Sequence, residues 1–99
     1  MSYVTTQPQM LSAAAGDLHS VGSVVSAANA AATGPTTGVI PAAADEVSAL
    51  TAAQFAAQAQ MYQVFSAQAA AIHDQFVATL ETSAESYLAT EAANAAATG

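Results

Sequence analysis

The sequence predicts an all-α fold: an antiparallel two-helix hairpin that completes a four-helix bundle with a partner chain. Alanine, the residue with the highest helix propensity, occupies 29 of the 99 positions. Two long stretches carry apolar residues at helical spacing. Glycine and proline cluster between these stretches, in residues 33–41. We therefore expect one domain over residues 1–99, with two helices joined by one loop.

The first helix is predicted over about residues 8–32. Thr6 and Gln9 have the spacing of a capping box, and Pro8 falls in the first turn, where proline is tolerated. Apolar residues then recur at steps of three and four, as in a bundle seam. These are Leu11, Ala14, Leu18, Val21, Val25, Ala28 and Ala32.

The loop is predicted over residues 33–41, because two Gly and two Pro in nine residues do not continue a helix. Gly34 suits a helix C-cap, and Pro35 suits the position after it.

The second helix is predicted over about residues 42–90, followed by a short Ala-rich tail. Asp45 and Glu46 in its first turn interact favourably with the helix dipole. The octapeptide AANAAATG occurs at 27–34 and at 92–99, and both copies are expected to close a helix.

In this arrangement residue 32 lies near residue 44, so that Pro8 falls opposite Gln68 and the rest of the second helix has no neighbour within the chain. An uncovered apolar stripe marks an interaction surface, and a partner supplying further helices would cover it. The overhanging residues are Ile72, Phe76, Val77, Leu80, Tyr87 and Leu88. The expected partner face comprises Leu11, Leu18, Val25, Phe55, Tyr62, Phe65, Ile72, Phe76 and Leu80; spacing does not divide it between the first helix and the partner.

Composition argues against several functions. The chain has no Lys or Arg and seven acidic residues, which give a net charge of −7. Such a chain does not neutralise nucleic-acid phosphates and is not expected to bind an anionic membrane directly. Cysteine is absent, which excludes disulfides and thiolate sites.

No residue pattern predicts catalysis. The two histidines, His19 and His73, lack metal-ligand spacing; the predicted register places His19 near residue 57 and His73 near Tyr3. No serine lies in a nucleophile elbow, and Asp45 and Glu46 are explained by the helix start. We expect no enzymatic activity, no metal and no cofactor.

Residues 1–20 lack the basic and apolar regions of a cleavable signal peptide, and no apolar run is long enough to span a membrane. Export would therefore need a dedicated route. Tyr87 and Glu91 are spaced i, i+4 and lie on one helix face, although this spacing alone is weak evidence for a signal.

Four stretches together resemble the PE proteins of mycobacteria. They are MSYVTTQP at 1–8, PAAADEVSALTAAQFAAQAQMY at 41–62, AAAIHDQFVATL at 69–80 and SYLATE at 86–91. The resemblance covers the whole chain, which looks like a bare PE domain without a glycine-rich extension. It departs from the family at Pro8-Gln9, where the name-giving Pro-Glu would stand.

The resemblance implies a helical hairpin that docks lengthwise on a PPE-family partner in a heterodimeric four-helix bundle. It implies export of the folded pair by type VII (ESX) secretion, to the medium or the cell surface. The Y-x-x-x-D/E export motif of the family maps onto Tyr87 and Glu91. An EspG-type chaperone would bind through the PPE partner. The DEVSAL stretch at the start of the second helix favours the fifth ESX system as the exporter. Roles at the envelope or in host interaction follow only by family analogy.

Two alternatives stay open. One is a self-sufficient homodimeric bundle of the WXG type, although the chain has no Trp for a W-x-G turn. The other is a role in an outer-envelope pair that admits nutrients, for which no residue argues directly.

Overall fold

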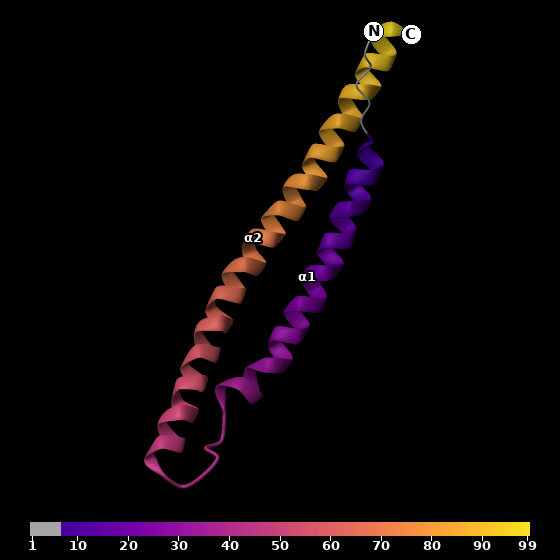
Figure 1. Cartoon of the computed structure of the whole chain (residues 1–99). Coiled ribbons are helices and arrows are strands. Elements are labelled where there is room, and N and C mark those ends of the chain that lie inside the picture. Colours follow the sequence, from indigo (N-terminus) through magenta and orange to yellow (C-terminus); the bar gives the residue numbers. More distant parts are fainter. Residues whose placement is uncertain (1–6) are drawn as a thin grey trace, which may run out of the picture. The chain divides into compact units, whose positions relative to one another are not determined.

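The structure is a computed structural model that describes residues 7–99. These residues form helix α1, Pro8–Thr37, and helix α2, Glu46–Thr98, with no strand among them (Figure 1). The all-α prediction is confirmed. Residues 38–45 connect the two helices.

The chain divides into two compact units. Of the described residues, 7–22 and 73–99 form the terminal unit, and 23–72 form the loop unit. In each unit a segment of α1 lies antiparallel beside a segment of α2 (Figure 1). The helical hairpin is thus present in the chain, whereas the four-helix bundle requires a second chain and stays a prediction.

Helix α1 begins at Pro8, the first-turn position that the sequence predicts. The carbonyl of Gln7 accepts hydrogen bonds from the backbone N–H groups of Met10 and Leu11, at 3.0 and 3.2 Å. The predicted capping residue Thr6 lies outside the described residues.

Helix α1 ends at Thr37, so the prediction that it stops at residue 32 is wrong. Gly34 does not act as a C-cap, since no residue among 7–99 has the left-handed backbone that such a cap needs. Glycine lacks the Cβ that would collide with the ring of Pro35, so the helix passes through this pair. The hydroxyls of Thr33, Thr36 and Thr37 each donate to the carbonyl four residues earlier.

Helix α2 begins at Glu46 rather than near residue 42, because Asp45 caps it from outside. The Asp45 carboxylate accepts hydrogen bonds from Ser48 N at 2.8 Å and from Ser48 Oγ at 3.1 Å. The bond from the Ser48 backbone holds the pKa of Asp45 below its usual value. The other end also differs from the prediction, since the helix continues through the Ala-rich tail to Thr98.

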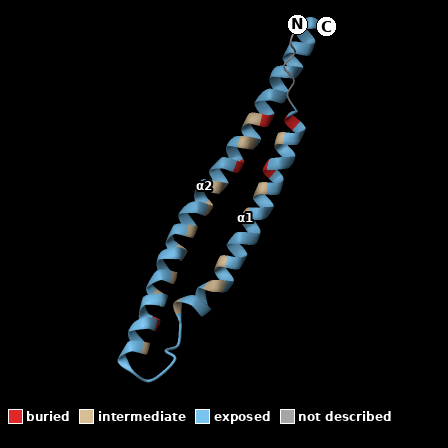
Figure 2. Ribbon diagram, viewed as in Figure 1, coloured by how far each residue is buried: buried red, intermediate tan, exposed pale blue. Residues whose placement is uncertain are grey.

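The contact between the helices in the terminal unit contains both large and small side chains. Buried and half-buried residues of this unit occur on both helices (Figure 2). Ala15 is fully buried and Val77 is 6% exposed. The residues that are buried or half-buried are Pro8, Leu11, Ala15, Leu18, Gly22, His73, Val77, Leu80, Ser83 and Ala84.

The contact in the loop unit is built almost entirely from small or polar side chains. On α1 it includes the half-buried Asn29 and Ala32. On α2, residues at steps of three and four face inward, and we call them the inner seam: Ala52, Ala56, Ala59, Gln63, Ser66 and Ala70. This seam continues in the terminal unit through His73, Val77, Leu80 and Ala84.

The predicted seam of α1 is therefore partly wrong. Leu11, Leu18 and Ala32 are at least half-buried, but Ala14, Val21 and Ala28 are exposed, and Ala15, Gly22 and Asn29 take the inward positions instead. At position 22 the ring of His73 occupies the space that a side chain would need. A Cβ on Gly22 would lie 2.7 Å from Nε2 of His73.

The predicted register is also wrong. Asn29 lies opposite Gln63 in the loop unit, and Leu18 lies opposite His73 in the terminal unit. The predicted neighbour of His73 was Tyr3, which lies outside the described residues. Helix α1 runs further before the chain reverses, and this shifts every pair. The same register brings Pro8 level with Ala84, and both are buried. Val77 and Leu80 therefore do not overhang but pack against α1.

Candidate interaction surface

A second row of residues runs along α2 beside the inner seam, and we call it the outer seam. Its large members are Phe55, Tyr62, Phe65, Ile72 and Phe76, which are spaced by seven, three, seven and four. Each has between 54% and 66% of its surface exposed. The first four belong to the loop unit and Phe76 to the terminal unit. Spacings of three, four and seven are those that a facing helix meets along a bundle seam.

The structure divides the nine residues of the expected partner face into two groups. Leu11, Leu18 and Leu80 are half-buried in the contact between α1 and α2. The five outer-seam residues and Val25 are exposed. The partner role of this second group remains a prediction, whereas the first group already has neighbours within the chain.

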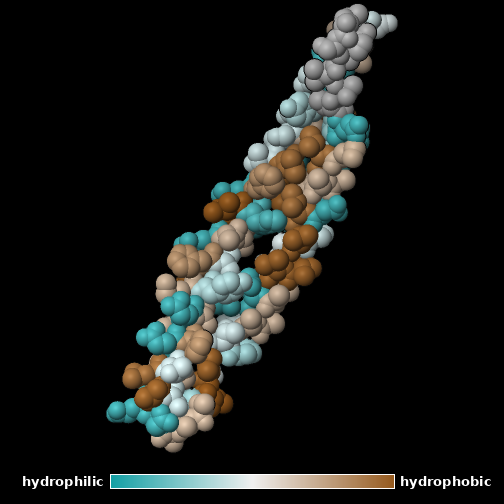
Figure 3. Space-filling model, viewed as in Figure 1, coloured by the Kyte–Doolittle hydropathy of each residue, from teal (hydrophilic) through white to brown (hydrophobic). Residues whose placement is uncertain are grey.

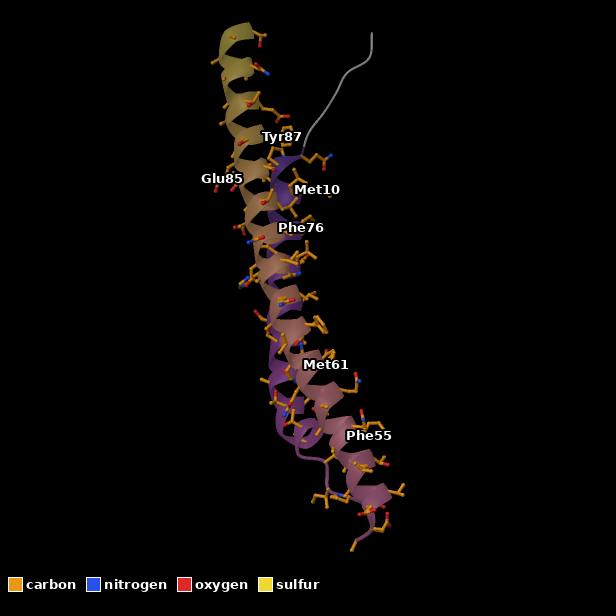
Figure 4. All side chains as sticks on the ribbon, turned by 90° about the vertical axis from the view of Figure 1, so that its left-hand side faces the viewer. Met10, Phe55, Met61, Phe76, Glu85 and Tyr87 are labelled. Atoms are coloured by element: carbon orange, nitrogen blue, oxygen red, sulfur yellow. The ribbon has the colours of Figure 1, made fainter. Side chains whose placement is uncertain are left out.

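Helix α1 contributes further exposed apolar residues, namely Met10 and Val21 in the terminal unit and Val24 in the loop unit. Hydrophobic side chains are visible on the surface of both units (Figure 3). In the terminal unit Met10, Phe76 and Tyr87 project to one side of the ribbon and Glu85 to the other (Figure 4). Three exposed apolar or aromatic side chains of this unit thus lie on the same side.

A shallow hollow of about 270 Å³ lies on α2 in the loop unit. It is lined by Thr51, Gln54, Phe55 and Gln58. These positions are i, i+3, i+4 and i+7, the arrangement that receives one side chain of a facing helix in knobs-into-holes packing. The hollow thus has the form of a helix contact.

Asn29 connects α1 to the outer seam. Its side-chain Oδ1 accepts a hydrogen bond from the Tyr62 hydroxyl at 2.8 Å, and its backbone carbonyl accepts one from Gln63 Nε2 at 3.0 Å. Asn29 was not among the residues predicted to lie at a helix contact, because a polar residue at this position interrupts the expected apolar pattern. Its position seven residues after Gly22 and three before Ala32 would have placed it on the inward face.

No group of three potential metal ligands occurs within residues 7–99. His73 lies in the inner seam with Nε2 2.7 Å from the Leu18 carbonyl oxygen. His19 is exposed on α1. The role of His73 is therefore to join the two helices.

Tyr87 and Glu91 both lie in the part of α2 that follows Ala84. Tyr87 is 48% exposed. Because α2 is continuous to Thr98, the two residues lie one turn apart on one helix face. The export role of Tyr87 and Glu91 stays a prediction.

None of the helices within residues 7–99 is both long enough and apolar enough to cross a membrane.

Comparisons with known proteins identify relatives over nearly the whole chain. A family profile described as the PE family matches residues 4–94. PE family protein PE13 of Mycobacterium tuberculosis is 69% identical over 97 residues, which are 98% of this chain and 98% of that protein.

Longer relatives match over the same region. PE-PGRS family protein PE_PGRS33 of Mycobacterium tuberculosis is 57% identical over 96 residues, 97% of this chain but 20% of that protein. PE_PGRS46 of Mycobacterium bovis is 55% identical over 96 residues, 97% of this chain and 12% of that protein. The chain thus spans a fifth or less of these two proteins. None of the three names mentions an enzymatic activity.

Proposed function

Because this chain belongs to the PE family, we propose that it is a non-enzymatic protein that pairs with a PPE-family partner and is exported with it, folded, by type VII (ESX) secretion. The outer seam of α2 is the observation that carries this proposal. It places five large apolar side chains on the surface at the spacing of a helix contact, while small or polar residues make the contact between the helices in the loop unit.

Two helices of the partner would lie along this surface and complete a four-helix bundle. The hollow beside Phe55 would receive an apolar side chain from one of them. All basic residues in the assembled pair would come from the partner, because this chain has none.

The export signal in this proposal is the pair Tyr87 and Glu91, which lies in α2 beyond the last buried residue, Ala84. Because these two residues are not needed for the outer-seam contact, pairing and export would be separable by mutation. An EspG-type chaperone would bind the PPE partner, and the exported pair would be secreted or remain at the cell surface.

A thermal unfolding experiment followed by circular dichroism, with light scattering on the same sample, tests the pairing. The chain alone is expected to unfold over a broad temperature range or to aggregate, since most of its large apolar residues are exposed. Co-expression with PPE-family proteins should yield a 1:1 complex that unfolds sharply at a higher temperature. A sharp transition from a monodisperse homodimer would instead support the self-sufficient bundle of the WXG type.

A further inference from the structure

The hydrogen bond between Tyr62 and Asn29 fixes one aromatic ring of the outer seam. Tyr62 is 54% exposed, yet its hydroxyl donates to Asn29 Oδ1 at 2.8 Å. The ring therefore reaches from α2 to α1 and is held at both ends, by its own backbone and by the amide. An exposed aromatic side chain without such a bond samples several rotamers.

Asn29 is itself held in place by α2. It is half-buried, and its backbone carbonyl accepts hydrogen bonds from Gln63 Nε2 and from Thr33 Oγ1, each at 3.0 Å. The side chain that accepts from Tyr62 thus extends from a backbone that Gln63 already joins to the neighbouring turn of α2. The position of the acceptor is set before any partner arrives.

This bond also determines what kind of group fits against Tyr62. When a partner covers the ring, the hydroxyl already has an acceptor, so its burial leaves no donor unsatisfied. The group that packs there need not offer a hydrogen-bond acceptor. The neighbouring outer-seam residue Phe65 also presents an apolar ring, so this part of the seam fits an apolar group.

We propose that Asn29 is a positioning residue for partner binding: it holds the Tyr62 ring in the orientation against which an apolar side chain of a partner helix packs. This inference rests on the proposed function. Ordering the ring before binding removes part of the entropy cost of association.

The test measures the affinity of the full chain for the PPE-family protein that co-purifies with it, by isothermal titration calorimetry. Tyr62→Phe retains the ring and Asn29→Ala retains the hydroxyl, and each is expected to weaken binding about three- to tenfold. The double variant should be no weaker than either single variant, because both remove the same bond. Asn29→Asp should restore the affinity, since a carboxylate also accepts from the hydroxyl.

Tyr87→Phe is the matched control. It removes the hydroxyl of the other half-exposed tyrosine of α2, which lies outside the outer seam, and it leaves the bond between Tyr62 and Asn29 intact. It is expected to change the affinity less than about twofold, because the Tyr62 ring stays in place.

Unchanged affinity in Tyr62→Phe, or an equal loss in Tyr87→Phe, would overturn the inference and leave the proposed function intact. Failure of the wild-type chain to bind any PPE-family protein would overturn the proposed function and this inference with it.

Discussion

The terminal unit and the loop unit join their helices with different chemistry. In the terminal unit Leu11, Leu18, Val77 and Leu80 lie in the contact, and Ala15 is fully buried. In the loop unit the inner seam offers alanine, serine and Gln63, and only Ala52 is buried. Apolar burial therefore stabilises the first contact more than the second.

The loop unit places its large residues elsewhere. Phe55, Tyr62, Phe65 and Ile72 all lie in the exposed outer seam, and Asn29 supplies polar contacts between the helices. Small residues at a helix contact bring the backbones together and leave the large residues free for another surface. We therefore expect the proposed partner to stabilise the loop unit more than the terminal unit.

A buried charge in the terminal unit should produce the largest loss of stability. Val77→Asp places a carboxylate in the helix contact, and the chain has no Lys or Arg to pair with it. We expect a loss of about 3–5 kcal/mol, measured by chemical unfolding of the PPE-bound pair. Val64→Asp, at an exposed position on α2 outside both seams, is the control and should cost about 0.5 kcal/mol or less in the same pair. Equal effects of the two variants would contradict the assignment of the inner seam.

Two half-exposed tyrosines should separate export from pairing. Tyr87→Ala in the terminal unit is expected to abolish export, because it removes half of the proposed signal, while the pair still co-purifies. Tyr62→Ala in the loop unit should instead weaken the pair by about 30-fold or more, as for a central aromatic contact. Immunoblots of culture filtrate and co-purification measure the two effects. Normal secretion of the Tyr87 variant would refute the signal assignment.

A charge introduced into the outer seam should weaken partner binding, whether it is placed in the loop unit or in the terminal unit. Phe65→Asp and Phe76→Asp are each expected to cost at least about 2 kcal/mol of binding free energy, since a carboxylate would be covered by the partner. Titration calorimetry with the PPE-family partner compares them, and we expect the loop-unit variant Phe65→Asp to lose more. Wild-type affinity in both variants would show that the partner binds elsewhere.

Two glycines of the terminal unit form a smaller, matched comparison. A Cβ at Gly22 would lie 2.7 Å from His73 Nε2, whereas one at Gly16 would meet nothing within 4 Å. Gly16→Ala should stabilise the chain by about 0.5–1 kcal/mol through helix propensity. Gly22→Ala should displace the His73 ring from the Leu18 carbonyl. We expect this variant to be about 1–2 kcal/mol less stable than Gly16→Ala. Equal stabilities on thermal unfolding would show that the ring moves without cost.

The cap of α2 in the loop unit should have the smallest effect, and one that depends on pH. The pKa of Asp45 is lowered in the folded chain, so its carboxylate stabilises the fold at pH values above the ordinary pKa of 3.8. That contribution is lost as the pH falls through the lower, folded pKa. Asp45→Ala should therefore unfold at a lower temperature than wild type at pH 7, and the gap should narrow at pH 2. A gap that is independent of pH would argue against the charged cap.

Much of the fold could be predicted from local patterns. The alanine content, the long stretch without Gly or Pro and the acid at the start of the second helix identify two helices and the start of each within a few residues. The end of the first helix was missed, because Gly34 and Pro35 usually stop a helix, whereas here the glycine relieves the clash with the proline. That error moved the predicted point of chain reversal and with it every predicted helix pair.

For the surface, periodicity identified the large apolar residues but not their direction. Leu18 and Phe55 both fit a helical stripe, yet Leu18 packs within the chain and Phe55 is exposed. Asn29 and Gly22 carried no apolar signal, although both lie in the contact. A search for apolar periodicity identifies large side chains. Positions where two helices pack closely favour small residues, which such a search overlooks.

The sequence by itself determined that the chain is all-α, that it is negatively charged without Lys or Arg, and that it carries large apolar residues at helical spacing. Helix propensity, charge and spacing are local properties of the residues and need no tertiary contact. Only the tertiary structure decided which of two adjacent seams on α2 faces α1. The seam of small residues lies inside because it allows the backbones to approach, and its contacts with Gly22 and Asn29 set the register. The aromatic seam is left on the surface as a consequence.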